Sequence, residues 1–183
     1  AMANATVENG WVNTADAESP EVIAKARNIL QNTPYCSLST CTADGIPWAS
    51  PVFYVFDSKV RLYWSSAISS RHSQNIYTNH GRVAIAIYGT DGGEGKGRGL
   101  YFSGIAGEVN PGQVEAVIHL LNERSGHQHR AAADYLPPSP RRLYCFEPDD
   151  LWVTGERVPF ENVLMDTKVK LNRKSLMGLA QLP

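Results

Sequence analysis

Several polar residues between positions 62 and 88 are of the types that bind an anion. Ser65 and Ser66 end a predicted strand, and Arg71 and His72 fall in the first turn of a predicted helix. Free N–H groups at a helix N-terminus attract negative charge, a guanidinium binds phosphate through two parallel hydrogen bonds, and hydroxyl groups complete the shell. The segment therefore predicts a phosphate site with Arg71 as its main cation. An N-capped helix with an exposed arginine stays open as the alternative on these residues alone.

The glycine-rich segment 89–99 does not carry a nucleotide-binding motif. In a P-loop that ended at Lys96, Thr90 would occupy the position of the first glycine and Gly97 the position of the hydroxyl residue. The dinucleotide-binding fingerprint also lacks its third glycine. The segment predicts a mobile hairpin loop, from which Lys96 and Arg98 could reach an anionic ligand of a neighbouring subunit.

Histidines and cysteines do not form a metal-binding pattern in this sequence. His127 and His129 would project to one side of an extended segment, but His119 lies within a predicted amphipathic helix, and no set of carboxylates or cysteines accompanies the three. Cys36 and Cys41 lie in one predicted strand at an odd separation, so their side chains point to opposite faces. We therefore expect no metal site. The GxSxG and HExxH motifs of hydrolases are absent as well.

The composition is typical of a folded protein of one domain. The chain has 183 residues, of which 43% are hydrophobic and 19% charged, and its formal net charge is −1. This balance gives no bulk attraction to nucleic acid or acidic membranes. No run approaches the roughly 18 apolar residues of a membrane helix. The three cysteines, an odd number, favour a reducing compartment. We expect a cytoplasmic protein that binds neither nucleic acid nor membrane.

Helix and strand signals begin after a polar, aperiodic segment, residues 1–18, which predicts a flexible N-terminal arm. Ser19 and Pro20 suit the N-cap and the first position of an amphipathic helix. A short polar helix is predicted over 69–79, and another amphipathic helix over 110–126. Strands are predicted over 35–41, 48–56, 60–65, 82–88, 100–109, 143–147 and 151–154.

The order of these elements predicts a mainly β fold, an antiparallel β-barrel with peripheral helices. Short meanders close a barrel and protect strand edges, and the regular βαβ alternation of a Rossmann fold is missing. Residues 19–157 are expected to form the barrel domain, and 158–183 a C-terminal tail that could pack on a partner subunit. In the strand 48–56, Pro51 cannot donate to a sheet hydrogen bond, so it marks an edge, a bulge or the close approach of another group.

Four segments follow one another in an order typical of one family: ADGIPWASPVFYVF, VRLYWSSAISSRHSQNI, RVAIAIY and RGLYFSGIAGEV. In this order they resemble the FMN-binding split-barrel superfamily, the pyridoxamine 5'-phosphate oxidase-like proteins. The resemblance covers about residues 23–109 and, weakly, 143–153. It implies a split β-barrel homodimer with FMN at the subunit interface. By position it implies these cofactor contacts: Ala49, Ser50, Pro51 and Val52 along the isoalloxazine ring, Ser65, Ser66, Arg71 and His72 around the phosphate, and Gly99 and Leu100 at the partner subunit.

Two features depart from the family's pattern. Where the family often has lysine after the phosphate-binding arginine, this chain has His72, a weaker and pH-dependent cation, which implies a lower or differently tuned phosphate affinity. The oxidase proper also carries a C-terminal Arg-x-His element for its vitamin B6 substrate, and no Arg-x-His occurs in this sequence. Genuine oxidation of pyridoxamine phosphate is therefore not expected.

The resemblance implies an FMN-dependent oxidoreductase whose small-molecule redox substrate is unknown. Bound flavin itself supplies hydride chemistry, so no catalytic side chain is required and none is predicted. Two alternatives stay open. One is a reductase that uses the deazaflavin F420 as a dissociable cosubstrate. The other is a non-catalytic split barrel that binds flavin or haem.

Overall fold

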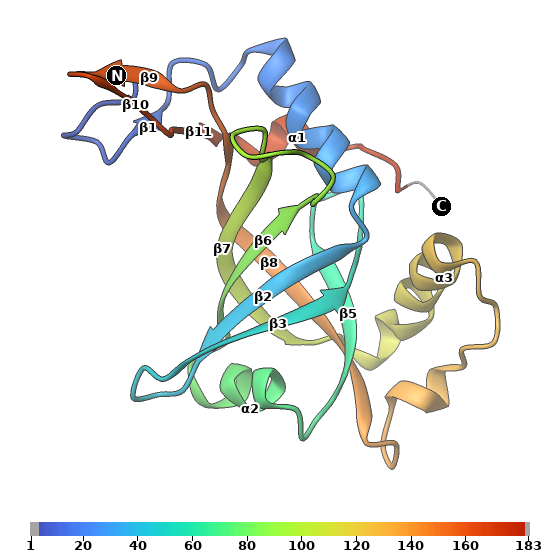
Figure 1. Ribbon diagram of the computed structural model, residues 1–183. Coiled ribbons are helices and arrows are strands. Elements are labelled where there is room, and N and C mark those ends of the chain that lie inside the picture. Colours follow the sequence, from blue (N-terminus) through green and yellow to red (C-terminus); the bar gives the residue numbers. More distant parts are fainter. Residues whose placement is uncertain (1–3, 182–183) are drawn as a thin grey trace.

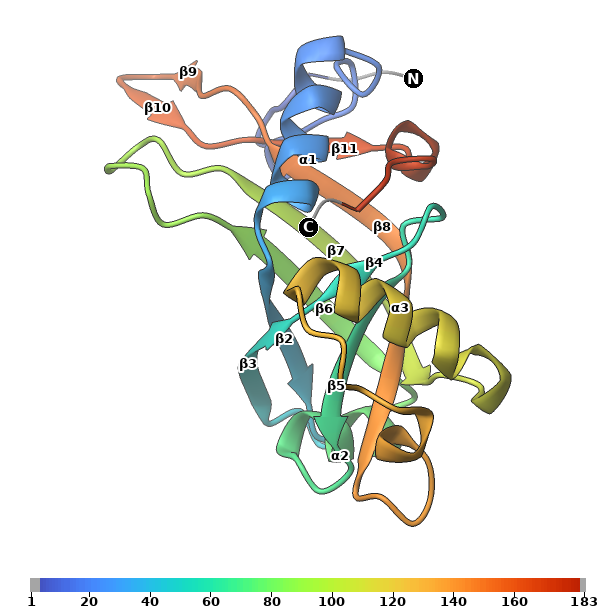
Figure 2. The same ribbon diagram turned by 90° about the vertical axis from the view of Figure 1, so that its right-hand side faces the viewer.

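The computed structural model describes residues 4–181, whose strands curl around one core with helices on the outside (Figures 1 and 2). The strands are β1 (Val12–Asn13), β2 (Tyr35–Cys41), β3 (Pro47–Phe53), β4 (Val55–Phe56), β5 (Leu62–Ala67), β6 (Arg82–Tyr88), β7 (Gly99–Glu108), β8 (Arg141–Thr154), β9 (Val158–Phe160), β10 (Val163–Met165) and β11 (Lys168–Leu171). The helices are α1 (Pro20–Asn32), α2 (Arg71–Thr78) and α3 (Val114–Ser125), with 3-10 turns at Pro111–Gln113, Ala132–Tyr135 and Arg173–Leu176.

The mainly β, split-barrel fold expected from the sequence is confirmed. The main sheet runs in the order β1-β11-β8-β7-β6-β2-β3, and β5 pairs with both β8 and β4 off this path. All pairs of this sheet in the described part of the chain are antiparallel except β1 with β11. Helix α1 lies across one end of the barrel, α2 lies at the opposite end and α3 packs on the side (Figure 1). The strands thus enclose an apolar interior and leave helix ends and strand ends to form sites.

Several predicted strands have different bounds in the structure. The expected strand 48–56 is divided at Tyr54, because the Tyr54 N–H donates to the carbonyl of Pro34 at 3.1 Å and its hydroxyl donates to the carbonyl of Leu30 at 2.9 Å. The expected strands 143–147 and 151–154 are one strand, β8, in which Gly104 of β7 faces Pro148 across an irregularity in register. A bulge accommodates a residue without an N–H, so proline does not end the strand here. Similarly, β5 begins at Leu62 rather than Val60, which has a positive φ of 65°.

The two ends of the described chain meet on the sheet. Regular structure was not expected before Ser19, yet β1 pairs in parallel with β11. The C-terminal tail extends the sheet as β11 beside β8, and Val169, Leu171 and Leu176 join the core. Residues 1–3 and 182–183, which belong to the predicted arm and tail, lie outside the described residues. The flexibility of the arm, the domain bounds and the packing of the tail on a partner stay predictions.

The core consists of the barrel interior and a smaller cluster under α3. The interior holds large side chains such as Trp64, Phe102 and Phe146, none more than 2% exposed. Helix α3 covers the outside of β4, β5 and the start of β8 with the predicted apolar face Val114, Val117, Ile118 and Leu121. No helix among residues 4–181 is long and apolar enough to cross a membrane.

Replacing Gly104 by alanine is expected to lower the free energy of unfolding by about 2–3 kcal/mol. A Cβ atom at this position would lie 2.2 Å from the carbonyl oxygen of Glu147 and 3.0 Å from the ring of Phe146, so the two strands must separate. Gly107 on the same strand is the matched control, because its Cβ would meet nothing within 4 Å. Urea denaturation compares the two variants, and equal midpoints would show that the close approach at Gly104 is not needed.

Candidate functional site

The strand-to-helix connection between β5 and α2 brings the predicted phosphate-binding residues together. Ser70 is the N-cap of α2, and its side chain accepts a hydrogen bond from the N–H of Ser73, so the helix begins at Arg71. The Ser66 hydroxyl and the Nε2 atom of His72 are 2.6 Å apart, and both side chains are buried. The start of the helix therefore holds His72 against the end of β5. The adjacency that the sequence predicted for these two residues is present.

A cavity of about 470 Å³ opens beside this pair, between β3, β5, α2 and the segment after α3. It is lined by Tyr35, Pro51, Val52, Phe53, Ser65, Ser66, Ala67, Ser70, His72, Leu121, Arg130, Tyr135 and Arg141. Five of the ten residues predicted to bind a cofactor are among them. The volume lies within the range of small-molecule sites, and the lining combines apolar walls with a few converging polar groups.

Two arginines that sequence reasoning missed supply the positive charge of this cavity. Arg141 donates to the Ser65 hydroxyl at 3.1 Å, and Arg130 is held by Asn122 and Ser125 at 2.9 and 3.1 Å. The cavity lining contains no carboxylate, and neither arginine has an ion-pair partner among the described residues. Cations without counterions around hydroxyls and a helix start form an anion-binding site. In the sequence, only the adjacent Arg141 and Arg142 at the start of β8 could have indicated this positive charge.

Arg71, the cation that the sequence favoured, lies elsewhere. Its guanidinium stacks on the ring of Trp48, 4.4 Å from the centroid, and the residue is exposed and absent from the cavity lining. Ala49 and Ser50 also lie outside the lining, on the same strand as Pro51. That strand, β3, pairs only with β2 in the described part of the chain, so Pro51 marks a sheet edge. The edge leaves backbone N–H and C=O groups free beside the cavity.

Gly99 and Leu100 are not brought to this cavity either. Gly99 lines a second, larger cavity at the start of β7, and its N–H donates to the Thr154 hydroxyl at 2.8 Å. The Leu100 side chain is fully buried in the barrel interior. Their predicted contact is with a partner subunit, so the arrangement of a single chain does not test it.

Three of the histidines lie at the surface and do not gather with other metal-ligand types in the described part of the chain. His119, His127 and His129 are exposed, and only the rings of the last two approach each other, with centroids 5.5 Å apart. No group of three or more potential metal ligands occurs among residues 4–181. Burial raises the pKa of the Cys36 thiol to about 12, while Cys41 on the opposite face is partly exposed.

Acid is expected to destabilise the protein through His72. Burial lowers the pKa of His72, so the unfolded chain binds a proton more readily than the folded chain. The contribution of the neutral ring to the free energy of unfolding is therefore fully present above pH about 6.5 and is lost as the pH falls below that value. We expect His72→Gln, which keeps a hydrogen-bonding side chain, to flatten the loss of unfolding free energy between pH about 7 and about 5. Thermal denaturation across this range measures the effect. Parallel pH profiles for the two proteins would rule out His72 as its source.

Comparison with known proteins agrees with the architecture. A family model described as pyridoxamine 5'-phosphate oxidase matches residues 22–155. No curated protein matches the sequence significantly. A protein of unknown function from Agrobacterium tumefaciens aligns with a TM-score of 0.62 at 20% identity, over 80% of this chain and 61% of that chain. A haem-binding protein from Mycobacterium smegmatis aligns with a TM-score of 0.57 at 20% identity, over 84% and 59%.

An F420 reductase also aligns, with a TM-score of 0.52 at 20% identity, over 68% of this chain and 94% of that chain. At these identities the solved structures establish a shared fold. The chain spans about three fifths of the length of the first two.

Proposed function

The chain belongs to the pyridoxamine 5'-phosphate oxidase family, and from this premise we propose that it is an FMN-dependent oxidoreductase whose flavin phosphate binds in the cavity between β5 and α2. The observation that carries the proposal is the charge of this cavity. Arg130 and Arg141 supply this charge beside the His72 ring and the hydroxyls of Ser65 and Ser66, and the lining contains no carboxylate. A phosphate dianion would satisfy both unpaired guanidinium groups.

The residues present fit the remaining parts of a flavin as well. Pro51, Val52 and Phe53 form an apolar wall beside the polar end of the cavity, and the free edge of β3 offers backbone groups to a ring with hydrogen-bonding atoms. A bound flavin supplies hydride transfer at its ring, whereas the protein binds, orients and shields it from water. No side chain is assigned a catalytic role. The substrate is unassigned, and the missing Arg-x-His element argues against the vitamin B6 oxidase reaction.

We also propose that two copies of the chain associate through the outer face of the sheet. A hollow of about 420 Å³ on this face is lined by the small residues Ser39, Ala84, Ala86 and Ser103 and by Tyr101 and Trp152, among others. Small side chains allow close approach of a second sheet, and the aromatic rings supply apolar area. Light scattering of Ala84→Arg should show a monomer. Ala24→Arg, on the exposed face of α1, is the control that should stay dimeric, and a monomeric unmodified chain would contradict this interface.

The test of the main proposal is the visible absorption spectrum of the purified protein, followed by fluorescence of the supernatant after denaturation. A yellow protein that releases a fluorescent flavin supports the FMN assignment. A colourless protein that does not bind added FMN contradicts it and favours F420, which would not be present in protein expressed in a host that lacks it, or a ligand that is not a flavin.

Haem is the second candidate ligand, and one observation favours it. His127 and His129 are exposed and close in sequence to Arg130, which lines the cavity, so an imidazole is available near the arginines that could hold the propionates of a haem. A haem-binding relative shares the fold. A Soret band that disappears in His129→Ala would favour haem and a non-catalytic role.

A further inference from the structure

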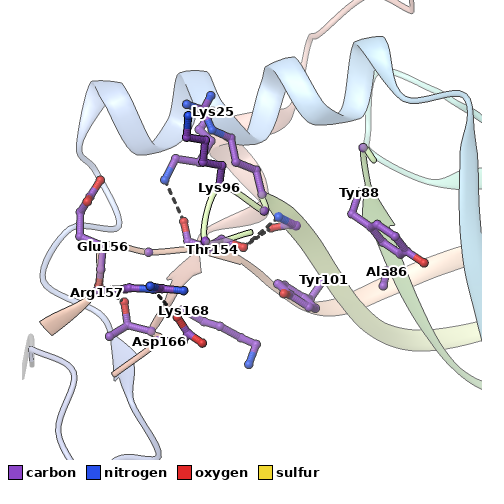
Figure 3. Close-up of a pocket in the computed structure, with 17 residues that line it drawn as sticks. Lys25, Ala86, Tyr88, Lys96, Tyr101, Thr154, Glu156, Arg157, Asp166 and Lys168 are labelled. Carbon is purple, nitrogen blue, oxygen red and sulfur yellow. Dashed lines mark hydrogen bonds and ion pairs between the residues drawn. The ribbon is translucent and has the colours of Figure 1, made fainter. Parts of the chain in front are cut away.

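The larger cavity, of about 900 Å³, lies at the other end of the molecule, between α1, the 89–99 loop, the end of β8 and the start of β11 (Figure 3). It shares no lining residue with the cavity between β5 and α2. Thr154 lies at the base of the cavity and accepts two hydrogen bonds. The Lys25 ammonium donates to its carbonyl at 2.9 Å, and the N–H of Gly99 donates to its hydroxyl at 2.8 Å. The base is therefore held in place by α1, β7 and β8 together.

Positive charge is concentrated in this second cavity although the chain as a whole carries −1. Five cations, Lys25, Lys96, Arg98, Arg157 and Lys168, line it against two carboxylates, Glu156 and Asp166. The carboxylate of Asp166 is already paired with Arg157 at 2.8 Å. Lys96 and Arg98 are exposed, and their side chains have no hydrogen bond or ion pair among the described residues. An excess of cations over carboxylates in a cleft favours a multiply charged anion.

The same cavity offers aromatic and backbone groups besides its charges. Tyr88, at the end of β6, is 54% exposed. The Lys168 ammonium makes a cation–π contact with Tyr101, 5.1 Å from the centroid of its ring (Figure 3). Gly95, Gly97 and Gly99 also line the cavity, and the backbone of a glycine can approach a ligand without side-chain obstruction. A ligand with one planar ring and a chain of anionic groups would use all three kinds of contact.

We propose that this second cavity binds a nucleoside polyphosphate, with its phosphates at Lys96 and Arg98 and its base against Tyr88. The volume favours a nucleotide over a single phosphate ion, which would leave most of the cavity empty. The loop lacks the P-loop and dinucleotide fingerprints, so affinity comes from side-chain charges and weakens as salt is added. The proposal uses none of the lining residues of the first cavity. Three of the residues that line the second cavity, Ala86, Tyr101 and Lys168, also line the hollow of the proposed dimer interface.

Calorimetric titration of the 183-residue chain with ADP, inorganic pyrophosphate and adenosine tests the proposal. We expect ADP to bind tightest, pyrophosphate about tenfold more weakly because it lacks the ring, and adenosine not measurably. The double variant Lys96→Ala, Arg98→Ala should bind ADP at least about tenfold more weakly. The matched control Lys59→Ala, Lys174→Ala removes the same charge from exposed positions outside the cavity and should bind ADP normally. Thermal midpoints verify that each variant is folded.

Three results would overturn the proposal. They are no heat from ADP at millimolar concentration, unchanged ADP affinity in the Lys96 and Arg98 variant, and pyrophosphate binding as tight as ADP, which would reduce the cavity to an anion site without a nucleoside. Arg141→Ala distinguishes the two cavities: it should leave ADP affinity unchanged, and a parallel loss would place ADP in the first cavity instead.

Discussion

Replacing Arg141 by alanine is expected to weaken FMN binding roughly thirtyfold, which corresponds to about 2 kcal/mol. Arg141 lines the β5–α2 cavity, donates to Ser65 and has no carboxylate partner among residues 4–181, so its charge is available to a phosphate. Removing it leaves Arg130 as the only arginine in the lining. Quenching of flavin fluorescence on titration measures the affinity, and Lys174→Ala is a control with the same loss of charge.

The companion variant Arg71→Ala separates the sequence-based prediction from the structural one. The sequence predicts Arg71 as the main phosphate cation, and its removal should then abolish most of the affinity. The structure instead places this guanidinium on Trp48, outside the cavity lining. We expect the Arg71 variant to lose less affinity than the Arg141 variant. The reverse order would show that Arg71 leaves Trp48 to bind the phosphate.

Replacing Arg124 by alanine is expected to lower the free energy of unfolding by about 3–4 kcal/mol. This arginine of α3 is 8% exposed, and its guanidinium donates to four backbone carbonyls: Tyr54 at 3.2 Å, Leu30 at 3.2 Å, Gln31 at 3.0 Å and Thr33 at 3.3 Å. The last three lie at the C-terminus of α1, where carbonyls have no partner within the helix. One side chain therefore satisfies a helix end and joins α3 to α1 and to Tyr54, between β3 and β4.

The control for Arg124 is Arg27→Ala. Arg27 also donates to a backbone carbonyl, that of Ser175, but from an exposed position, so water can replace it and the expected loss is below about 1 kcal/mol. Urea denaturation monitored by circular dichroism compares the two. Similar losses would show that the carbonyls around Arg124 find other partners in the variant.

Local periodicity determined much of the secondary structure from the sequence. The strands 35–41 and 82–88 and the apolar face of α3 were predicted as they occur, because alternation and helical spacing depend only on neighbouring residues. The same local signals placed Ser66 beside His72, since a strand end and a helix start separated by a short turn must lie together. The sequence also indicated the family through the order of these segments.

Contacts between distant residues were decided only by the tertiary structure. The β-bulge that carries Pro148 through β8 depends on Gly104, and the pairing of β1 with β11 depends on how the chain ends meet. Arg130 and Arg141 reach the β5–α2 cavity from a segment about 60 to 75 residues further along the chain than Ser65 and His72. Residue type and spacing cannot reveal such partners, because the direction in which an arginine points is set by the packing around it. The sequence by itself therefore determined the fold class and the chemistry of one short segment, whereas the folded chain determined which cations face it.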